Sequence, residues 1–265
     1  MKKYLEITKT QFKSQLVYRF DVALTAVGTI GRVLFAFILW GAIFEGRDVV
    51  GGFTYQTMLA YYLVSSFLTS LEMSEGISRE VAELIRGGKF SKFMVIPSSP
   101  LPHFMAQNFG KAAYYAIFSA IATVVSLFVF HITPSITGDI PSLLCVVAMV
   151  LLGLTFMVVY QFFIGILAFK FQDVDFFLRV QGALLTFATG SMIPLSLLPA
   201  PVLWVLRFLP FTYVTYTPTM LLLGEISLSE GIFGLGVLAV WLAAMTLLVY
   251  STYRRFRIKF DGVGI

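Results

Sequence analysis

Long runs of apolar residues separated by short polar segments dominate this chain. Six runs approach or exceed the ~20 residues that a helix needs to cross the hydrocarbon core of a bilayer. Their bounds are 22–44, 53–71, 112–130, 141–169, 178–198 and 231–252. None shows the ten-residue alternation of apolar and polar positions that is typical of membrane barrels. The pattern therefore predicts an all-α integral membrane protein with six transmembrane helices.

Composition excludes a soluble alternative. Apolar residues make up 58% of the chain, 27 residues are Phe and only 12% are charged, whereas soluble domains are about 25% charged. So few charges cannot cover a water-facing surface of this size. No internal repeat or low-complexity tract is visible, so residues 1–265 are predicted to form a single domain.

The basic residues are sorted between the predicted loops. Sixteen of the nineteen lie before span one, between spans two and three, between spans four and five, or in the tail after span six. Arg47 and Arg207 lie on the other side, and Arg32 lies within span one. By the positive-inside rule, both termini and the long second loop are cytoplasmic. The first apolar run is too long for a cleavable signal sequence.

Two segments outside the spans have distinct patterns. In residues 1–21, Leu5, Phe12, Leu16 and Phe20 recur among lysines near helical spacing, which predicts an amphipathic helix on the inner leaflet. The apolar segment 199–230, before span six and the basic tail 231–265, is interrupted by prolines that prevent one continuous helix. A re-entrant helical hairpin shielded by protein is the expected solution.

The second loop contains a short amphipathic helix, predicted over residues 76–92. Its apolar positions share one helical face, and Gly87 and Gly88 provide a stop signal. Two interpretations remain open from the pattern alone: docking of a soluble partner, or an interfacial helix lying on lipid. The apolar positions are Ile77, Val81, Leu84 and Ile85, and the charged ones Arg79, Glu80, Glu83 and Arg86.

The sequence contains few groups that carry chemistry. Gly87-Gly88-Lys89 is not a Walker A motif, because Glu83 replaces the first glycine and Phe90 the required Ser or Thr. The chain is therefore expected to have no nucleotide site of that type. One cysteine, Cys145, and two distant histidines predict no intramolecular disulfide and no metal site.

Two stretches resemble the permeases of ABC-2-type ABC exporters. They are ISREVAELIRGGKFSKFMVIPSSPL, residues 77–101, and GSMIPLSLLPAPVLWVLRFLPFTYVTYTPTMLLLGE, residues 190–225. The resemblance is closest to the small six-helix permeases that usually occur as two non-identical chains with a separate ATPase. The matching positions are Ile85, Gly88, Phe93, Met94 and Pro97, then Pro194, Pro199, Pro210, Phe211, Tyr216, Pro218 and Gly224.

The resemblance implies a role for each segment. Residues 76–92 would be the coupling helix on the ATPase, the loop Lys170–Arg179 a second contact, and residues 199–223 the re-entrant cap of the path. The contact residues would be Ile77, Arg79, Glu80, Val81, Glu83, Leu84 and Arg86, with Lys170, Asp173 and Asp175 in the second contact.

The resemblance also implies partners and a location. The chain would be a transport subunit rather than an enzyme, without a cofactor of its own, with ATP and Mg²⁺ held by the partner. Its partners would be a cytoplasmic ABC ATPase dimer, the bilayer and a second ABC-2 permease chain, with no nucleic acid. A heterodimer of permeases is favoured and a homodimer is the alternative. The location would be a bacterial or archaeal cell membrane.

Arg32 lies near the middle of span one. A guanidinium at that depth costs ~2.5–3.5 kcal/mol on insertion scales, so it should face protein, a wet cavity or substrate, or else snorkel toward an interface. Candidate path residues are therefore Arg32 together with Pro210, Tyr213 and Tyr216 of the re-entrant segment. Anchoring in the aromatic belt is the alternative for the two tyrosines.

Two other function classes compete with a permease. An intramembrane protease or lipid transferase needs a base or metal ligands at membrane depth, and an ion-coupled carrier usually needs intramembrane carboxylates and often paired halves. The predicted spans show none of these. The transported substrate does not follow from the sequence, since apolar walls fit lipids, hydrophobic drugs and peptides alike.

Overall fold

The computed structural model describes residues 2–95, 99–171 and 175–260, and this part of the chain is built from helices joined by turns and loops. The all-α prediction is confirmed. The longest helices are α2 (Arg19–Ile43), α3 (Tyr55–Leu71), α6 (Pro100–Val129), α7 (Ile140–Ile166) and α11 (Leu228–Phe260). The shorter ones are α1 (Lys2–Ser14), α4 (Glu75–Arg86), α5 (Lys92–Val95), α8 (Asp175–Ala188), α9 (Ala200–Leu206) and α10 (Tyr216–Leu222). Four 3₁₀ turns are η1 (Lys89–Ser91), η2 (Leu167–Phe169), η3 (Leu195–Leu197) and η4 (Pro210–Tyr213).

Four helical segments within the described residues are long and apolar enough to cross a membrane. They are Phe20–Ile43, Pro100–Val129, Ile140–Phe169 and Leu228–Phe256, and they correspond to four of the six predicted spans. The other two predicted spans contain α3 with 17 residues and α8 with 14. At 1.5 Å per residue these rise about 26 Å and 21 Å, less than the ~30 Å hydrocarbon core.

Two predicted boundaries differ from the helices for local reasons. The run 178–198 stays apolar, but α8 ends at Ala188 because Gly190 has φ +73°, a left-handed conformation that glycine favours. The Tyr61 hydroxyl donates a 2.6 Å hydrogen bond to the Gly190 carbonyl and fixes that turn. In contrast, α6 begins at Pro100, well before the run at 112, because proline is tolerated in a first turn and Lys111 interrupts the apolar run without interrupting the helix.

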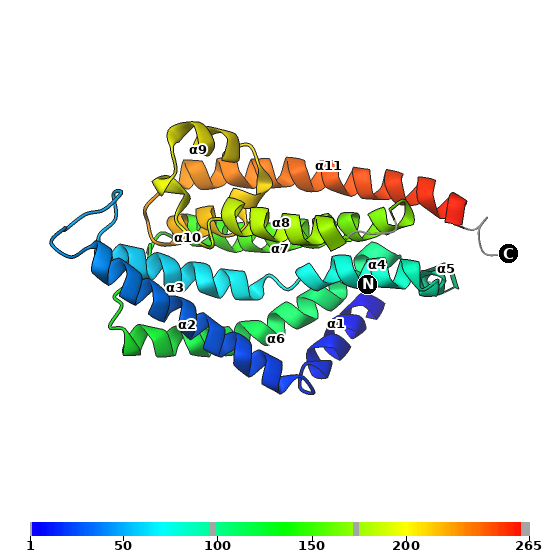
Figure 1. Ribbon diagram of the computed structural model, residues 1–265, viewed down its shortest axis with the longest axis horizontal. Coiled ribbons are helices and arrows are strands. Elements are labelled where there is room, and N and C mark those ends of the chain that lie inside the picture. Colours follow the sequence, from blue (N-terminus) through cyan, green and yellow to red (C-terminus); the bar gives the residue numbers. More distant parts are fainter. Residues whose placement is uncertain (1, 96–98, 172–174, 261–265) are drawn as a thin grey trace.

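The helices form two groups (Figure 1). α2, α3 and α6 pack on one another, with α1 across α6, while α11 lies along α7 together with α10. α4 packs on α7. The groups are tied together where α6 packs directly on α7 and where α10, which packs on α7, also contacts α3. α8 has its main contacts with α4 and η4 only, which leaves much of its surface open.

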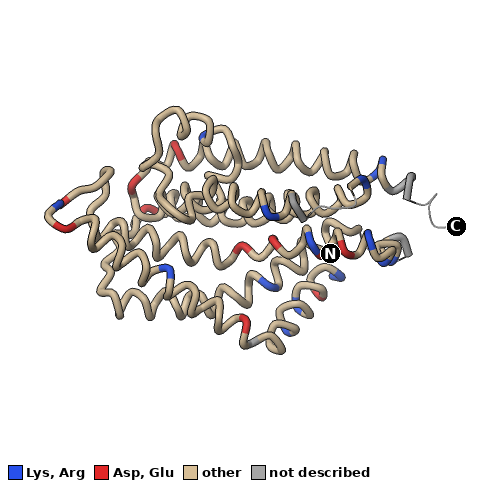
Figure 2. The backbone as a smooth tube through the Cα atoms, viewed as in Figure 1, with Lys and Arg blue, Asp and Glu red and all other residues tan. Residues whose placement is uncertain are grey.

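The segments that carry most of the basic residues lie toward one end of the molecule's long axis. The start of α1, the helices α4 and α5, and the end of α11 lie at one end of the molecule, and the α2–α3 loop lies at the other. Figure 2 shows Lys and Arg concentrated at the α4–α5 end. The sorting of basic residues along the sequence is therefore also a sorting in space.

The amphipathic N-terminal segment is helical over Lys2–Ser14, and it crosses α6 closely. The Thr8 hydroxyl donates to the Ala106 carbonyl at 3.0 Å, and the rings of Phe12 and Tyr114 meet edge to face at 5.3 Å. Gly110 makes this crossing possible, because a Cβ there would lie 2.4 Å from the Thr8 carbonyl oxygen. Leu5 on α1 and Leu16 in the turn after it remain exposed, so this segment has an apolar surface left for lipid.

We predict that Gly110→Ala displaces α1 from α6. The added methyl group overlaps the α1 backbone, and overpacking of this kind costs about 1–3 kcal/mol. Trypsin should then cut after Lys9 and Lys13 several-fold faster in detergent-purified protein. Gly236→Ala, on an open face of α11, is the matched control. Unchanged digestion of the Gly110 variant would contradict the assignment of this crossing.

Candidate functional site

The helix α4 is held on the rest of the chain by its apolar face. Ile77, Val81 and Ile85 recur every four residues and are at most 4% exposed. Their cluster includes Val158, Val159, Phe162 and Ile166 on α7. The left-handed Gly88 (φ +69°) then turns the chain away from the helix. α4 is thus fixed to α7 in the manner of a core helix.

The closest approach of the two helices is at Gly165 on α7. A Cβ at this position would lie 2.7 Å from the Val81 Cβ and 3.0 Å from the Ser78 carbonyl oxygen. Real Cβ atoms do not come so close without a shift of the neighbouring chain, so only glycine fits here. The two helices are therefore closely packed at this position.

The predicted coupling residues divide into two sets in the structure. Ile77 and Val81 are buried against α7, and Leu84 is partly buried beside them. Arg79, Glu83 and Arg86 are exposed, and Glu80 is partly exposed. The amphipathic helix is present, but it ends at Arg86 rather than at residue 92, because the left-handed Gly88 breaks it. Its apolar face is occupied within the chain, so a partner would meet the charged face.

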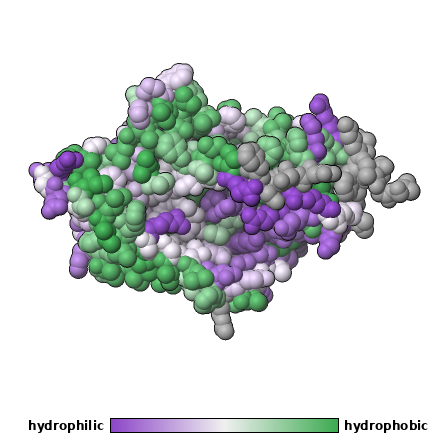
Figure 3. Space-filling model, viewed as in Figure 1, coloured by the Kyte–Doolittle hydropathy of each residue, from purple (hydrophilic) through white to green (hydrophobic). Residues whose placement is uncertain are grey.

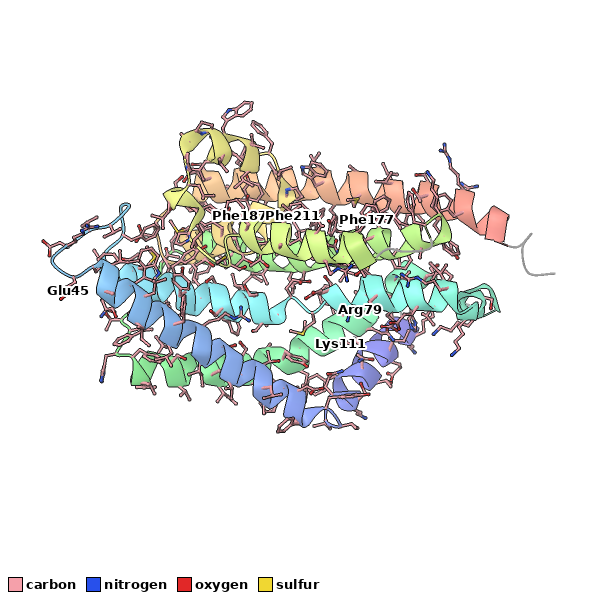
Figure 4. All side chains as sticks on the ribbon, viewed as in Figure 1. Glu45, Arg79, Lys111, Phe177, Phe187 and Phe211 are labelled. Carbon is pink, nitrogen blue, oxygen red and sulfur yellow. The ribbon has the colours of Figure 1, made fainter. Side chains whose placement is uncertain are left out.

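A charged groove lies between α4 and α8. It has a volume of about 480 Å³, and its walls include Glu75, Arg79 and Glu83 on α4 and Arg179 on α8. Figure 4 shows where the two helices face each other, with Arg79 on α4 and Phe177 on α8. This groove lies at the basic end of the molecule.

The groove continues into an interior cavity of about 360 Å³. Glu75, Leu178, Gln181 and Gly182 belong to the walls of both. Hydroxyl and amide groups line this cavity, from α2, α3, α7, α8 and the segment between η4 and α10: Thr25, Thr69, Ser70, Gln161, Gln181, Thr186, Thr189, Ser191 and Thr215. A polar lining inside an apolar bundle is unusual enough to indicate a functional space.

A third cavity of about 620 Å³, which we call the lateral opening, lies between α2 and α8. It shares Arg32, Thr69, Thr186 and Ser191 with the interior cavity. Its remaining walls are Gly28, Gly31, Phe35, Tyr62 and Met192. The three cavities therefore form one continuous feature, which we call the α2–α8 groove. Figure 3 shows a hydrophilic band on this face between the two helix groups.

Arg32 lies where the interior cavity meets the lateral opening. Among the described residues its guanidinium has no hydrogen-bond or acidic partner. Glu72 lines the same cavity, but its carboxylate is engaged by Ser74, which donates from its amide at 3.0 Å and from its hydroxyl. Arg32 is exposed in the isolated chain and lines both cavities. The expectation that it faces protein, a wet cavity or substrate, with snorkelling as the alternative, stays a prediction.

The other predicted path residues lie away from the groove walls. Pro210 and Tyr213 are buried, and the Tyr213 hydroxyl donates to the Arg207 carbonyl at 2.6 Å while its ring fills the space beside Gly234 on α11. Tyr216 packs at 6.1 Å from Tyr61. These residues support the short helices, and Val214 and Thr215 reach the cavity instead.

The second predicted contact is only partly described. Lys170 follows η2, and its ammonium lies 5.2 Å from the centroid of the Phe171 ring. Asp175 is the first residue of α8, and Asp173 lies outside the described residues. η2 contacts α4, so the end of α7 and the start of this loop lie beside α4.

Sequence reasoning missed the polar lining of α8, although a signal was present. Leu178, Gln181, Gly182, Leu185, Thr186 and Thr189 are spaced by three or one residues and so share one helical face. The Gln181 amide donates to Gln161 Oε1 at 3.1 Å, which joins α8 to α7 inside the cavity. Within residues 2–95, 99–171 and 175–260, no three His, Cys, Asp or Glu side chains gather as a metal site would require.

A comparison with family models decides the family. The model described as ABC-2 family transporter protein matches residues 30–259. The chain belongs to the ABC-2 transporter family. It is accordingly a multi-pass membrane permease of the ABC transporter type, a membrane component that associates with an ABC ATPase. No curated protein sequence matches this permease.

Glu72 gives the site a testable pH dependence. Burial raises the pKa of this carboxyl, and the hydrogen bonds from Ser74 offset part of the effect. The folded chain therefore holds the proton more tightly than the unfolded chain, and the stability contributed by this carboxyl is lost as pH rises through its folded pKa. Once ionised, the buried carboxylate is a net cost to folding.

We predict that Glu72→Gln raises the Tm of the detergent-purified permease at pH 8. The gain should shrink as pH falls toward the ordinary glutamate value of 4.5. Glu83→Gln, at an exposed position on α4, is the control and should leave Tm nearly unchanged. A Glu72 variant with a pH-independent Tm difference would show that burial of the carboxylate is not the cause.

Gly165→Ala tests the contact between α4 and α7. The methyl group has no space beside Val81, so we expect a loss of about 1–3 kcal/mol, which corresponds to a Tm lower by several degrees. Gly76→Ala, on an open face of α4 itself, should be neutral. Equal melting temperatures for the two variants would mean that the helices do not approach at Gly165.

Proposed function

We propose that this permease forms one half of the translocation path of an ATP-driven exporter. In this proposal a separate cytoplasmic ABC ATPase dimer binds ATP and Mg²⁺ and docks on α4. The observation that carries the proposal is the two-sided character of α4. One face is buried on α7, and the other presents charged side chains beside a groove that leads into a polar cavity.

The charged face of α4 suits a docking role. Arg79, Glu83 and Arg86 alternate in sign along the exposed side, and complementary charges on a partner would set its orientation and association rate. Because α4 is tied to α7 at Gly165, movement of a docked ATPase would pass directly into a long helix. Lys170 and the following loop, at the end of α7, would supply the second contact.

Six spans are proposed for the membrane arrangement, with α3 and α8 added to the four long apolar helices. α3 is largely buried by its neighbours, so it needs little contact with lipid, and α8 is followed by an ordered turn held by Tyr61 and Tyr62. α9, η4 and α10 would form the re-entrant cap at the outer end, and α1 would lie at the inner interface. The basic α4–α5 end would face the cytoplasm of a bacterial or archaeal cell.

A second ABC-2 permease chain would close the groove. α8 exposes Phe177, Val180, Leu184 and Phe187 along one face, and α2 exposes Val27, Phe35 and Ile38 on the other side of the opening. Apolar surfaces on both sides of a polar groove fit a facing subunit that turns the groove into an enclosed path. We favour a heterodimer, from the closest resemblance in the sequence.

The coupling proposal predicts the effect of reversing charges on α4. The double variant Arg79→Glu/Glu83→Lys should weaken retention of the ATPase by about tenfold, roughly 1.4 kcal/mol, because the charge pattern would be inverted. The measurement is purification of the tagged permease in mild detergent, with quantitative mass spectrometry of the bound proteins and assay of ATPase activity.

The matched control is Arg254→Glu, an exposed charge at the end of α11 on the same side of the molecule. It should retain the ATPase. Full retention by the α4 double variant would place the docking surface elsewhere, and ATP-independent transport in proteoliposomes would favour an ion-coupled carrier instead.

A further inference from the structure

We infer that the α2–α8 groove binds an amphiphile with an anionic group, which Arg32 holds while the apolar part lies in the lateral opening. The inference rests on the proposed transport function and names the chemical class of its substrate. Three observations carry it: an unpaired guanidinium, unpartnered polar atoms in the cavity wall, and an apolar opening that meets both.

The guanidinium of Arg32 is a strong binding group without a ligand in the described chain. Its side chain is exposed in the isolated chain, lines both cavities and has no hydrogen-bond or acidic partner among the described residues. Glu72, the carboxylate of the same cavity, is occupied by Ser74. A guanidinium kept in an apolar span is costly unless something pairs with it, and carboxylates and phosphates fit its planar fork.

Space for that anion exists beside Arg32. Gly28 lies one helical turn before it, Gly31 directly precedes it, and a Cβ at either position would meet nothing within 4 Å. The α2 wall is therefore open on the N-terminal side of Arg32. Larger residues at these positions would fill the opening.

The cavity wall offers further polar groups that the chain leaves unused. Gln181 is 8% exposed, and its Oε1 atom has no hydrogen-bond partner among the described residues, although its amide nitrogen is engaged by Gln161. The Thr69 hydroxyl is likewise buried and unpartnered within the described chain. Since buried polar groups are normally satisfied, these atoms indicate a ligand that also carries a hydroxyl or amide donor.

The lateral opening selects the rest of the ligand. Its volume of about 620 Å³ is within the usual range of small-molecule sites. Phe35, Tyr62 and Met192 provide apolar walls beyond Arg32, and Phe35 and Met192 are also largely exposed at the surface. An acyl or prenyl chain fits along these walls while its charged end reaches the guanidinium. A small hydrophilic anion would leave these walls without a partner.

The test is direct binding to the permease purified with its natural partners in nanodiscs. Radiolabelled dodecyl phosphate is the anionic amphiphile, dodecylphosphocholine is the zwitterionic control, and inorganic phosphate is the free anion. We expect dodecyl phosphate to bind at least tenfold more tightly than either control.

Arg32→Gln should weaken dodecyl phosphate binding by about tenfold to a hundredfold, because a charge-assisted contact is lost. Arg32→Lys should recover most of the affinity, and Arg47→Gln, which removes an exposed charge from the α2–α3 loop, should match the unsubstituted chain. Gly28→Leu should weaken dodecyl phosphate binding by filling the opening. Equal binding of all three probes, or no effect of Arg32→Gln, would overturn the inference.

Two outcomes separate this inference from the proposed function. Loss of a second permease chain from the Arg32→Gln preparation would assign the guanidinium to subunit assembly and overturn the ligand role. If no ATPase copurifies but dodecyl phosphate still binds in an Arg32-dependent manner, the exporter proposal fails and the anionic-amphiphile site stands.

Discussion

The close contact of α4 with α7 is the constraint on which the proposed working of this permease depends. An amphipathic helix outside the bundle would ordinarily need lipid or a partner to cover its apolar face. Here Ile77, Val81 and Ile85 are covered by the chain itself, and Gly165 allows a backbone approach that no larger residue would permit. α4 is therefore packed on α7 as a core helix is, and its charged face is left for other molecules.

α8 has an open surface because the remaining helices cover one another's apolar faces. α7 is covered by α11, α4 and the η4–α10 segment, with Gly153, Gly231 and Gly234 making room for that segment on α7 and α11. α2, α3 and α6 cover one another. α8 is left with α4 and η4 as its main neighbours, and its polar face lines a cavity. The groove is thus the boundary between two internally packed groups.

Hydropathy was sufficient to predict the long helices but not their exact ends. The apolar runs correspond to α2, α6, α7 and α11 because burial in lipid or protein requires the same residues. The end of α8 depended on backbone geometry, since Gly190 adopts a left-handed conformation fixed by the Tyr61 hydroxyl, a partner 129 residues away. Lys111 illustrates the opposite error, because a charge can interrupt an apolar run while the helix continues.

The candidate site was less predictable, because its main feature arises between elements. The sequence pattern was enough to predict that α4 is amphipathic. It did not predict that α7 covers the apolar face, since nothing in the apolar run around Gly165 distinguishes that glycine. Arg32 was recognisable as an anomaly, yet only the fold shows that it meets Gln181, Thr69 and the lateral opening. In the re-entrant segment, prolines and tyrosines were conspicuous, but they build the short helices, while the less conspicuous Val214 and Thr215 reach the cavity.

The position of the groove has a mechanical consequence. Its walls come from both helix groups, with Thr25, Arg32 and Thr69 on one side and Gln161, Gln181 and Thr215 on the other. A force applied at α4 acts on α7 and hence on one group first. The groups are joined by the hydrogen bonds of Tyr61 to Gly190 and Tyr62 to Met192 at the end far from α4, and by the packing of α6 on α7. α4 and α8 make few contacts with each other, so we expect the groove to widen or narrow more between them than at the Tyr61 end. A ligand bound at Arg32 would lie between these two ends of the groove. A small rotation of one helix group would change which end is open.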